Sequence, residues 1–254
     1  MNSQDTLQQL VDLSHDLGRP EHDLAILGEG NASAVVDDDS FLVKASGSEL
    51  RTIRPDQIVR VDRAKCRAIL AGPALSDTQI KEALQDAVAD PQVELRPSVE
   101  TVMHAALLDL PGINFVGHTH PTTINSLTCS DRFEDWLTPR LFPDHIVVCG
   151  SSAALVPYVD PGLPLAAAVL ESAKQYQQRW DEVPKTIFLK NHGFIALAGS
   201  AKQVMQITLM AVKSAKILLG AAAAGNPIFM SDADVARIAG RDDEHYRQKM
   251  LQGG

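Results

Sequence analysis

The stretch INFVGHTHPTTINSL, residues 113–127, passes from strand-like to helix-like sequence within a few residues. Its first half, INFVGHTH, is rich in the β-branched and aromatic residues that favour a strand. Pro121 follows, at a position that the first turn of a helix tolerates, because an N–H there has no partner within the helix. The stretch therefore predicts a strand that leads directly into a helix, with His118 and His120 near the junction.

The segments on either side alternate between the same two kinds of pattern. Apolar residues at helical spacing end at Gly18 and Pro20, which predicts a first helix. We expect a hairpin over residues 28–47 with its turn at the acidic residues 37–39. The remaining predicted strands are 58–62, 146–150, 186–191 and 194–199, and the remaining helices are 76–89 (N-cap Ser76), 97–110 (N-cap Ser98), 163–178 and 201–225.

This mixture of strands and helices predicts an α/β protein whose central mixed or antiparallel sheet is covered by helices. With 254 residues, 45% of them hydrophobic, the chain is long enough to bury one large core. No stretch has the composition of a linker. We therefore expect a single domain over residues 1–254, with a helical tail from about residue 226.

Charge and cysteine content exclude several classes of function. A formal net charge of −9 argues against a nucleic-acid or membrane-surface partner, because such partners require a basic face. Three cysteines without C-x-x-C spacing argue against a disulfide framework. The N-terminal residues lack a signal-peptide pattern, and no apolar run reaches the ~18 residues of a membrane span, so we expect a cytoplasmic protein. GEGNAS lacks the third glycine of a dinucleotide fingerprint and leads into a predicted strand, which excludes NAD binding there.

The two histidines of the opening stretch are candidate metal ligands. Residues i and i+2 of a strand point to the same face, so His118 and His120 present their rings side by side. The pair alone fits either a ligand pair or two structural histidines. A third candidate is His192, at the tip of a tight Asn-His-Gly turn between two predicted strands. Three neutral imidazoles are typical of a catalytic zinc site, in which Mn²⁺ or Co²⁺ can replace the zinc.

His104 stands four residues after Glu100, on the same face of a predicted helix. We expect it to be an ordinary histidine on the helix surface. The alternative is a role behind the metal site, in contact with a residue that touches the metal or the substrate.

Five motifs give the chain a resemblance to a known family. They are GEGNAS (28–33), KASG (44–47), PSVE (97–100), GHTHP (117–121) and KNHG (190–193). In this order they resemble the class II aldolase/adducin family, over roughly residues 5–220. The resemblance implies a three-layer α/β/α sandwich, a zinc ion on His118, His120 and His192, and a homotetramer with its sites near the subunit interfaces.

The resemblance also implies a reaction and further site residues. Its enzymatic members suggest a metal-dependent aldolase that cleaves a ketose phosphate or related sugar by a retro-aldol reaction through a metal-held enediolate. Glu100 falls on the position of the acid/base. The positions that hold a substrate phosphate fall on Asn31, Ser46, Gly47 and Ser98, and small residues and a helix start suit an anion.

Three positions depart from the pattern of the fuculose-phosphate aldolases. Val99 stands where those enzymes have a second serine, which removes one hydrogen bond to the phosphate. No tyrosine occurs near residues 140–150, where those enzymes have a tyrosine acid; either Asp144 or His145 takes its place, or both are ordinary polar residues before a strand. Tyr246 corresponds to a C-terminal tyrosine of the family or belongs to a solvated tail.

Three other functions therefore remain open. A decarboxylase of a 3-oxo acid phosphate would use the same metal, and ALVPYVDPG (154–162) resembles such members. An epimerase would break and re-form the same bond. A non-catalytic, adducin-like interaction module is an alternative of another class, and such modules need not keep the three histidines.

Overall fold

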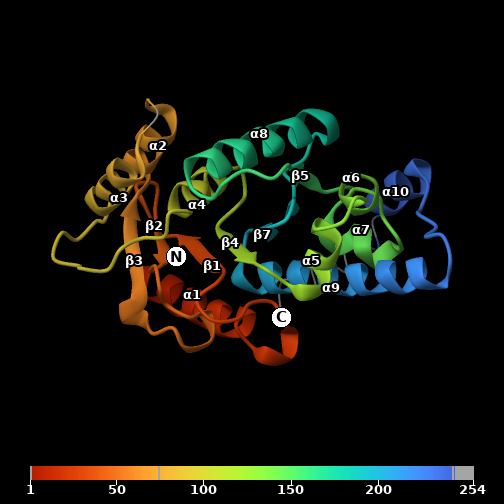
Figure 1. The fold of residues 1–254 in the computed structure, drawn as a ribbon, viewed down its shortest axis with the longest axis horizontal. Helices are drawn as coiled ribbons and strands as arrows, with labels where there is room; N and C mark the ends of the chain where they lie inside the picture. Colours follow the sequence, from red (N-terminus) through yellow and green to blue (C-terminus); the bar gives the residue numbers. More distant parts are fainter. Residues whose placement is uncertain (1, 74, 242, 244–254) are drawn as a thin grey trace.

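A computed structural model describes residues 2–73, 75–241 and 243 of the chain. In this part a seven-stranded sheet lies between two layers of helices (Figure 1). The predicted three-layer α/β/α sandwich is confirmed.

The sheet has the strand order β3-β2-β1-β4-β7-β6-β5. All neighbouring strands are antiparallel except β5 and β6, which are parallel. The strand β4, which carries the GHTHP motif, is therefore central, between β1 and β7. The strands are β1 (Asn31–Val35), β2 (Ser40–Lys44), β3 (Ile58–Asp62), β4 (Phe115–Thr119), β5 (Ala154–Val156), β6 (Thr186–Leu189) and β7 (Gly193–Ala198).

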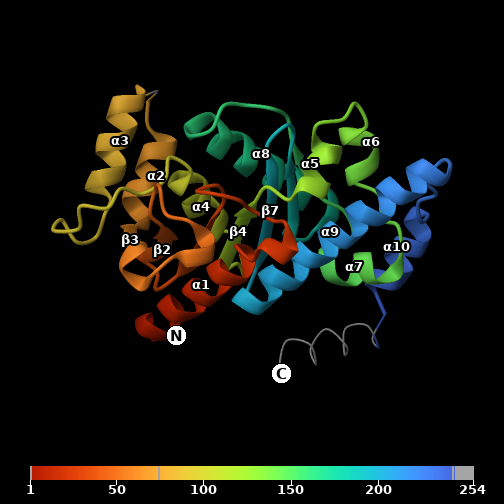
Figure 2. The ribbon, with the colours of Figure 1, turned by 60° about the horizontal axis from the view of Figure 1, so that its bottom comes forward.

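The helices cover both faces of this sheet. In Figure 1, α2, α3, α4 and α8 form the upper layer, and α1 and α9 lie below. Figure 2 shows α1 and α9 side by side on their face of the sheet. The helices are α1 (Ser3–Leu17), α2 (Arg63–Ala71), α3 (Asp77–Asp86), α4 (Thr101–Leu108), α5 (Thr122–Thr128), α6 (Phe133–Leu137), α7 (Pro143–Cys149), α8 (Leu163–Trp180), α9 (Ala201–Ala224) and α10 (Asp232–Ala239), with short 3₁₀ turns at Pro20–His22, Leu50–Thr52 and Pro55–Gln57.

Each face of the sheet has its own hydrophobic core, because alternate residues of a strand point to opposite faces. In β7, Ile195 and Leu197 pack with the upper helices. Phe194 and Ala196 belong to the cluster between the sheet and the helices α1 and α9. All six residues of β7 are buried, which explains why its sequence is almost uniformly apolar.

Helix α9 is long and apolar enough to cross a membrane by length and composition. It packs along one face against β4 and β7 and contributes Val204, Ile207 and Ala211 to the core. Its apolar character therefore has an explanation within the fold.

Residues 146–150 were predicted as a strand, and this prediction is wrong. IVVC forms the end of helix α7, which begins at Pro143 and ends before Gly150. Gly150 has a φ of +84° and a ψ of 178°, a conformation that is essentially confined to glycine. A short β-branched run fits a strand or a buried helix equally well, and here the flanking proline and glycine fit the helix.

The helix predicted over 97–110 begins later than expected. It starts at Thr101 with Glu100 as the N-cap residue, so the prediction of Ser98 as N-cap is wrong. Residues 98–100 instead form a turn in which Ser98 Oγ accepts the N–H of Glu100 (3.3 Å). The helices α2 and α6 and the three-residue strand β5 were not predicted from the sequence, whereas α10 falls within the predicted helical tail.

Candidate metal centre

His118 lies within β4, and His120 directly follows this strand. Both are at the end of the central strands where β1 begins. Across the strands, His118 is paired with Asn31 of β1 on one side and Ile195 of β7 on the other. Gly193 allows this arrangement, because a Cβ at that position would lie 2.6 Å from Thr119 O and 2.7 Å from His120 Cδ2. A side chain there would push the ring of His120 away.

His192 is at the tip of the β6–β7 hairpin, as the Asn-His-Gly sequence predicted. Asn191 adopts a φ of +54°, a conformation that asparagine tolerates better than most residues. Asn125 of α5 supports the tip by donating its side-chain N–H to His192 O (3.0 Å). The hairpin thereby directs the imidazole of His192 toward the end of β4.

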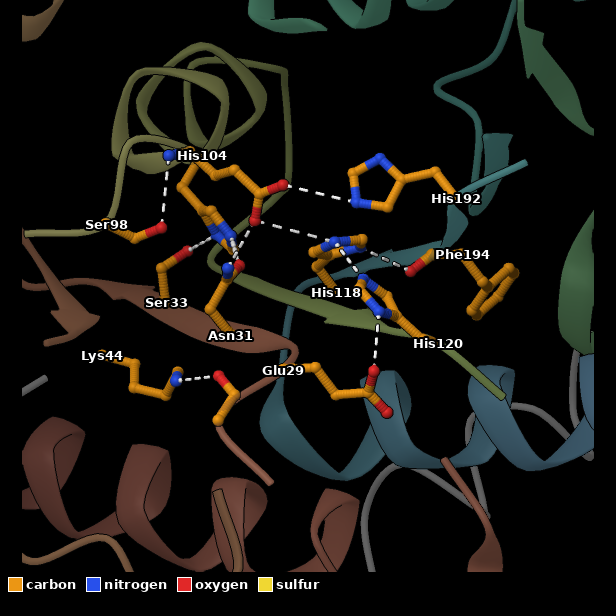
Figure 3. Close-up of polar contacts among 12 residues, drawn as sticks. Glu29, Asn31, Ser33, Lys44, Ser98, His104, His118, His120, His192 and Phe194 are labelled. Atoms are coloured by element: carbon orange, nitrogen blue, oxygen red, sulfur yellow. Dashed lines mark hydrogen bonds and ion pairs between the residues drawn. The ribbon is translucent and has the colours of Figure 1, made fainter. Parts of the chain in front are cut away.

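The three predicted histidines come together in one cluster (Figure 3). Their ring centroids are 4.8–5.0 Å apart, and one ligand atom from each lies within 4.8 Å of the others. His118 is fully buried, whereas His120 and His192 are partly accessible. This cluster can hold one metal ion and leave a side open to a substrate.

Hydrogen bonds fix the tautomers of two of these rings. His118 Nδ1 donates to Phe194 O (3.1 Å), and His120 Nδ1 donates to the Glu29 carboxylate (3.1 Å). In neutral rings the two Nε2 atoms are then unprotonated, and they face each other at 3.0 Å. Two lone pairs at this distance repel each other unless a cation lies between them. The donor set thus fits a divalent metal ion bound through Nε2.

Glu100 faces the histidines from the turn before α4. Its Oε1 is 3.5 Å from His192 Nε2, and its Oε2 is 3.7 Å from His118 Nε2. Burial raises the pKa of this carboxyl, but His118, the hydrogen bond from Asn31 and His192 together lower it to about 2. Glu100 is therefore ionised at neutral pH. Burial also lowers the pKa of His118, to about 3, which keeps the ring neutral and its lone pair available.

A buried chain of hydrogen bonds lies behind Glu100. Asn31 Nδ2 donates to Glu100 Oε2 (2.7 Å), and His104 Nε2 donates to Asn31 Oδ1. Ser33 Oγ donates to His104 Nδ1 (2.6 Å). His104 is completely buried, so the expectation of a helix-surface histidine is wrong and the alternative, a role behind the site, matches its position. It is buried because its helix, α4, is enclosed on every side, with all eight residues buried.

The candidate phosphate residues lie in two adjacent loops. Residues 45–48 and 96–98 are joined by the bond from Ser46 N to Arg96 O (2.8 Å) and by a bridge between Ala45 and Pro97. Ser46 and Gly47 are exposed, and Gly47 has a φ of +78°. The N–H of Ser46 is already used, so the candidate residues of these loops offer a ligand the Gly47 N–H and the hydroxyls of Ser46 and Ser98. Asn31 has one N–H beyond the one that Glu100 accepts.

Two of the other three candidates, Asp144 and His145, do not join this cluster. Asp144 and His145 are in α7, which packs against α9 and α10. His145 is buried beside Phe142 and accepts a weak bond from Leu141 N–H (3.5 Å). The expectation that one of the two serves as the acid has no support within a single chain. Tyr246 lies outside the described residues.

Two site residues were not found from the sequence. Glu29 contacts His120, and Lys44 donates its ammonium protons to Gly28 O (3.0 Å) and Ser48 O, which ties the GEGN and KASG segments together. Burial lowers the pKa of Lys44, and the negative charge of Glu100 opposes this effect. Both residues occur within the quoted motifs, so position in a motif was the available signal. Their partners, however, become neighbours only in the folded sheet.

Comparison with known proteins identifies the family. The family model described as the Class II Aldolase and Adducin N-terminal domain matches residues 8–219. The chain therefore belongs to the class II aldolase/adducin family.

Individual relatives differ in their names. The Bacillus subtilis (strain 168) protein called uncharacterized oxidoreductase YuxG is 25% identical over 174 residues, 68% of this chain, but the match spans only 23% of that protein. The 3-oxo-tetronate 4-phosphate decarboxylase of Haemophilus influenzae (strain ATCC 51907 / DSM 11121 / KW20 / Rd) is 25% identical over 187 residues, 72% of this chain and 74% of the relative. A solved structure of an L-fuculose 1-phosphate aldolase has a similar fold, with a TM-score of 0.71, 22% identity, and coverage of 97% of this chain and 98% of the other.

Proposed function

We propose that this protein is a metal-dependent carbon–carbon lyase, an aldolase that cleaves a ketose phosphate or a related sugar. The observation that carries the proposal is the arrangement of three imidazoles around one point, with the ionised Glu100 facing them from the opposite side. Membership of the class II aldolase/adducin family supports it.

We propose Zn²⁺ as the ion held by His118, His120 and His192, with Mn²⁺ or Co²⁺ as possible replacements. Three neutral nitrogen ligands with an open position are typical of catalytic zinc. When bound, such an ion supplies a Lewis acid that stabilises the negative charge developing on a carbonyl oxygen as the neighbouring carbon–carbon bond breaks.

Glu100 is proposed to accept and return the proton of the reaction. Its carboxylate is ionised at neutral pH, so it is ready to accept a proton from a substrate hydroxyl. Asn31 fixes Oε2 by hydrogen bonding, whereas Oε1 points toward His192. Oε1 is therefore the oxygen that we expect to exchange the proton.

The loops at residues 45–48 and 96–98 are proposed to bind the phosphate of the substrate. Gly47 supplies a backbone N–H, and Ser46 and Ser98 supply hydroxyls. A Cβ at Gly47 would meet nothing within 4 Å, so space for a ligand exists beside its backbone. Val99 is 40% exposed next to Ser98, which places an apolar side chain near this region.

Decarboxylation of a 3-oxo acid phosphate is the second candidate. The similarity to the Haemophilus influenzae decarboxylase, which extends over most of both chains, favours it. A metal ion held by the same histidines would stabilise the same type of developing charge, and carbon dioxide would leave in place of an aldehyde. The presence of all three histidines together with Glu100 argues against a non-catalytic module.

We further propose that the protein acts in the cytoplasm as a homotetramer on a small-molecule substrate, without a nucleic-acid or membrane partner. The net charge of −9 supports the absence of those two partners.

A substrate screen tests the proposed activity. Metal-loaded protein is incubated with ketose 1-phosphates, unphosphorylated ketoses and 3-oxo acid phosphates, and release of aldehyde and of carbon dioxide is followed separately. An aldolase releases aldehyde from a ketose 1-phosphate, and this activity disappears with a chelator and in His192→Ala. Carbon dioxide release alone identifies the decarboxylase. If no substrate of any class reacts while the metal is bound, both candidates fail.

A further inference from the structure

We propose that Glu29 is a positioning residue for the metal centre: its carboxylate holds His120 in the tautomer and orientation that present Nε2 to the metal ion. The proposal rests on the proposed metal centre and extends it to a residue outside the three histidines and Glu100.

The contacts of Glu29 are specific at both oxygens. Oε2 is 3.1 Å from His120 Nδ1, and Oε1 accepts the backbone N–H of Ile26 (2.7 Å). Figure 3 shows the carboxylate below the ring of His120, on the side away from His118. A carboxylate can only accept hydrogen bonds, so Nδ1 of His120 must carry the proton. Nε2 is then left to face His118, at 3.0 Å.

The turn that carries Glu29 is held in place from two directions. Glu29 N–H donates to Ile26 O (3.2 Å), and Lys44 donates to Gly28 O (3.0 Å) from the opposite side. Leu27, within this turn, has a φ of +53° although it is not a glycine, and its side chain is 77% exposed. This conformation is costly for a leucine and persists only where the surroundings impose it. The side chain of Leu27 is exposed, so its burial does not compensate for this cost. The strained residue belongs to the turn that positions the Glu29 carboxylate.

His120 needs such a partner more than its neighbours do. His118 is fully buried and donates to Phe194 O, so the sheet itself orients that ring. His120 lies beyond the end of β4, with a side chain that is 21% exposed. Among the hydrogen bonds of the described residues, the ring of His120 makes one to a group outside the histidine cluster. This is the bond to Glu29. Metal-bound histidines commonly donate their second ring N–H to a carboxylate or a carbonyl in this way.

Glutamine cannot replace Glu29 at both contacts. A carboxylate accepts from the Ile26 N–H and from His120 Nδ1–H together, whereas an amide has one acceptor and one donor group. In Glu29→Gln the NH₂ group must face one of these two donors. If it faces His120, it favours the tautomer that carries its proton on Nε2, which blocks the ligand atom.

The test measures zinc affinity, which does not depend on the substrate. Wild type, Glu29→Gln and the control Glu49→Gln are titrated with Zn²⁺ in competition with a chromophoric chelator at one pH. The control has the same change of charge, and its carboxylate contacts the hydroxyl of Thr52 (3.4 Å). We expect Glu29→Gln to bind zinc about 10–100-fold more weakly, the usual effect of losing such a partner, and Glu49→Gln to match wild type.

The outcomes separate this proposal from the metal centre itself. Equal zinc affinity in wild type and folded Glu29→Gln, with about one ion bound by each, overturns the role of Glu29 and leaves the metal centre intact. Absence of zinc binding in wild type overturns both. If Glu29→Gln does not fold, ¹⁵N spectra of the histidine rings in metal-free wild type decide the matter: protonation of His120 at Nδ1 is expected, and protonation at Nε2 alone contradicts the proposal.

Discussion

At Glu100, opposite effects act on one carboxylate. Burial favours the protonated form, whereas the imidazoles and the amide of Asn31 favour the charged form and prevail. A buried carboxylate that is kept ionised suits a group that accepts a proton from a hydroxyl near the metal. The sequence identified Glu100 through its motif, but the balance between burial and neighbours depends on distances that only the folded protein defines.

Replacing Glu100 by glutamine should separate metal binding from proton transfer. The side chain keeps its volume, and its amide oxygen can still accept from Asn31. We expect Glu100→Gln to fold and to retain zinc, while turnover falls roughly 10²–10⁴-fold, the usual contribution of general acid–base catalysis. Steady-state kinetics with the substrate found in the screen, together with metal analysis, provide the measurement. A turnover close to that of wild type would remove Glu100 from the mechanism.

His104 should make folding stability depend on pH. Burial lowers its pKa from the usual 6.5 to about 4, with Glu100 opposing this shift. As the pH falls from 6.5 towards 4, the unfolded chain therefore takes up a proton that the folded protein does not, and the free energy of unfolding decreases. Between pH 7 and pH 5 this one group removes about 2 kcal/mol.

The substitution His104→Gln should abolish that part of the pH dependence. Its amide N–H can still donate to Asn31 Oδ1, and it does not titrate. Denaturant unfolding of the metal-free protein at the two pH values should show a loss of stability that is smaller by about 2 kcal/mol than in wild type. His22→Gln is the control for the number of histidines. An unchanged pH dependence in His104→Gln would show that the His104 ring gains its proton in the folded protein too.

At the scale of single residues, the sequence predicted the ligands but not the groups behind them. His118, His120 and His192 follow from i, i+2 spacing and a turn sequence, both of which are local patterns. Glu29 and His104 act through contacts across 91 and 73 positions of the chain, to His120 and Asn31. No local pattern contains such contacts.

Among the elements, the β6–β7 hairpin lies against the end of β4 at Gly193, with no space for a side chain there. A methyl group at this position would lie 2.6 Å from Thr119 O and 2.7 Å from the His120 ring. Gly193→Ala should therefore destabilise the protein by about 1–3 kcal/mol, as overpacking does, and weaken zinc binding by displacing His120.

Gly220→Ala is the matched control, because a Cβ at this position in α9 meets nothing within 4 Å. Alanine in a helix is favoured over glycine, so this variant should be more stable than wild type by about 0.5–1 kcal/mol. Denaturant unfolding of both variants gives the comparison. Gly193→Ala with wild-type stability and zinc affinity would mean that the strands separate there at little cost.

Ser98 has one observed contact and one proposed role, and a single substitution can test the proposed role. Its hydroxyl accepts the N–H of Glu100 and is a candidate phosphate donor. If it binds phosphate, Ser98→Ala should raise KM for a phosphorylated substrate and leave the dephosphorylated analogue unaffected, with a loss of about 1.5–3 kcal/mol for a charged hydrogen bond. Equal effects on both substrates would indicate that Ser98 only shapes the turn before α4.

Element types followed from sequence wherever a pattern was long. The hairpin of β1 and β2, the strand β4 and the helices α8 and α9 were predicted because their patterns extend over many residues. The error at α7 arose from four apolar residues whose periodicity does not distinguish a strand from a helix. The missed helix α2 has a capping residue, Asp62, which accepts a backbone N–H of the first turn. This cap was a visible signal.

At the scale of the whole molecule, strand order creates the site. β4 lies between β1 and β7, so residues 31, 118 and 193 meet at one end of these central strands although they are far apart in the sequence. Helix α4 packs on this region, and Glu100 at its start lies 3.7 Å from His118 Nε2 and 3.5 Å from His192 Nε2. Sequence patterns predicted an α/β sheet covered by helices, and the resemblance implied the sandwich. The strand order depends on long-range pairing, which no local pattern specifies.

The most direct test of the account is the metal content of purified wild type and His192→Ala. Both proteins are loaded with Zn²⁺, freed of unbound ion and analysed for metal per chain, with circular dichroism to confirm that the variant is folded. We predict about one ion per wild-type chain and none retained by the variant, because two imidazoles without the third bind zinc too weakly to survive removal of free ion. Equal metal in both folded proteins would contradict the assignment of the three histidines as the metal centre.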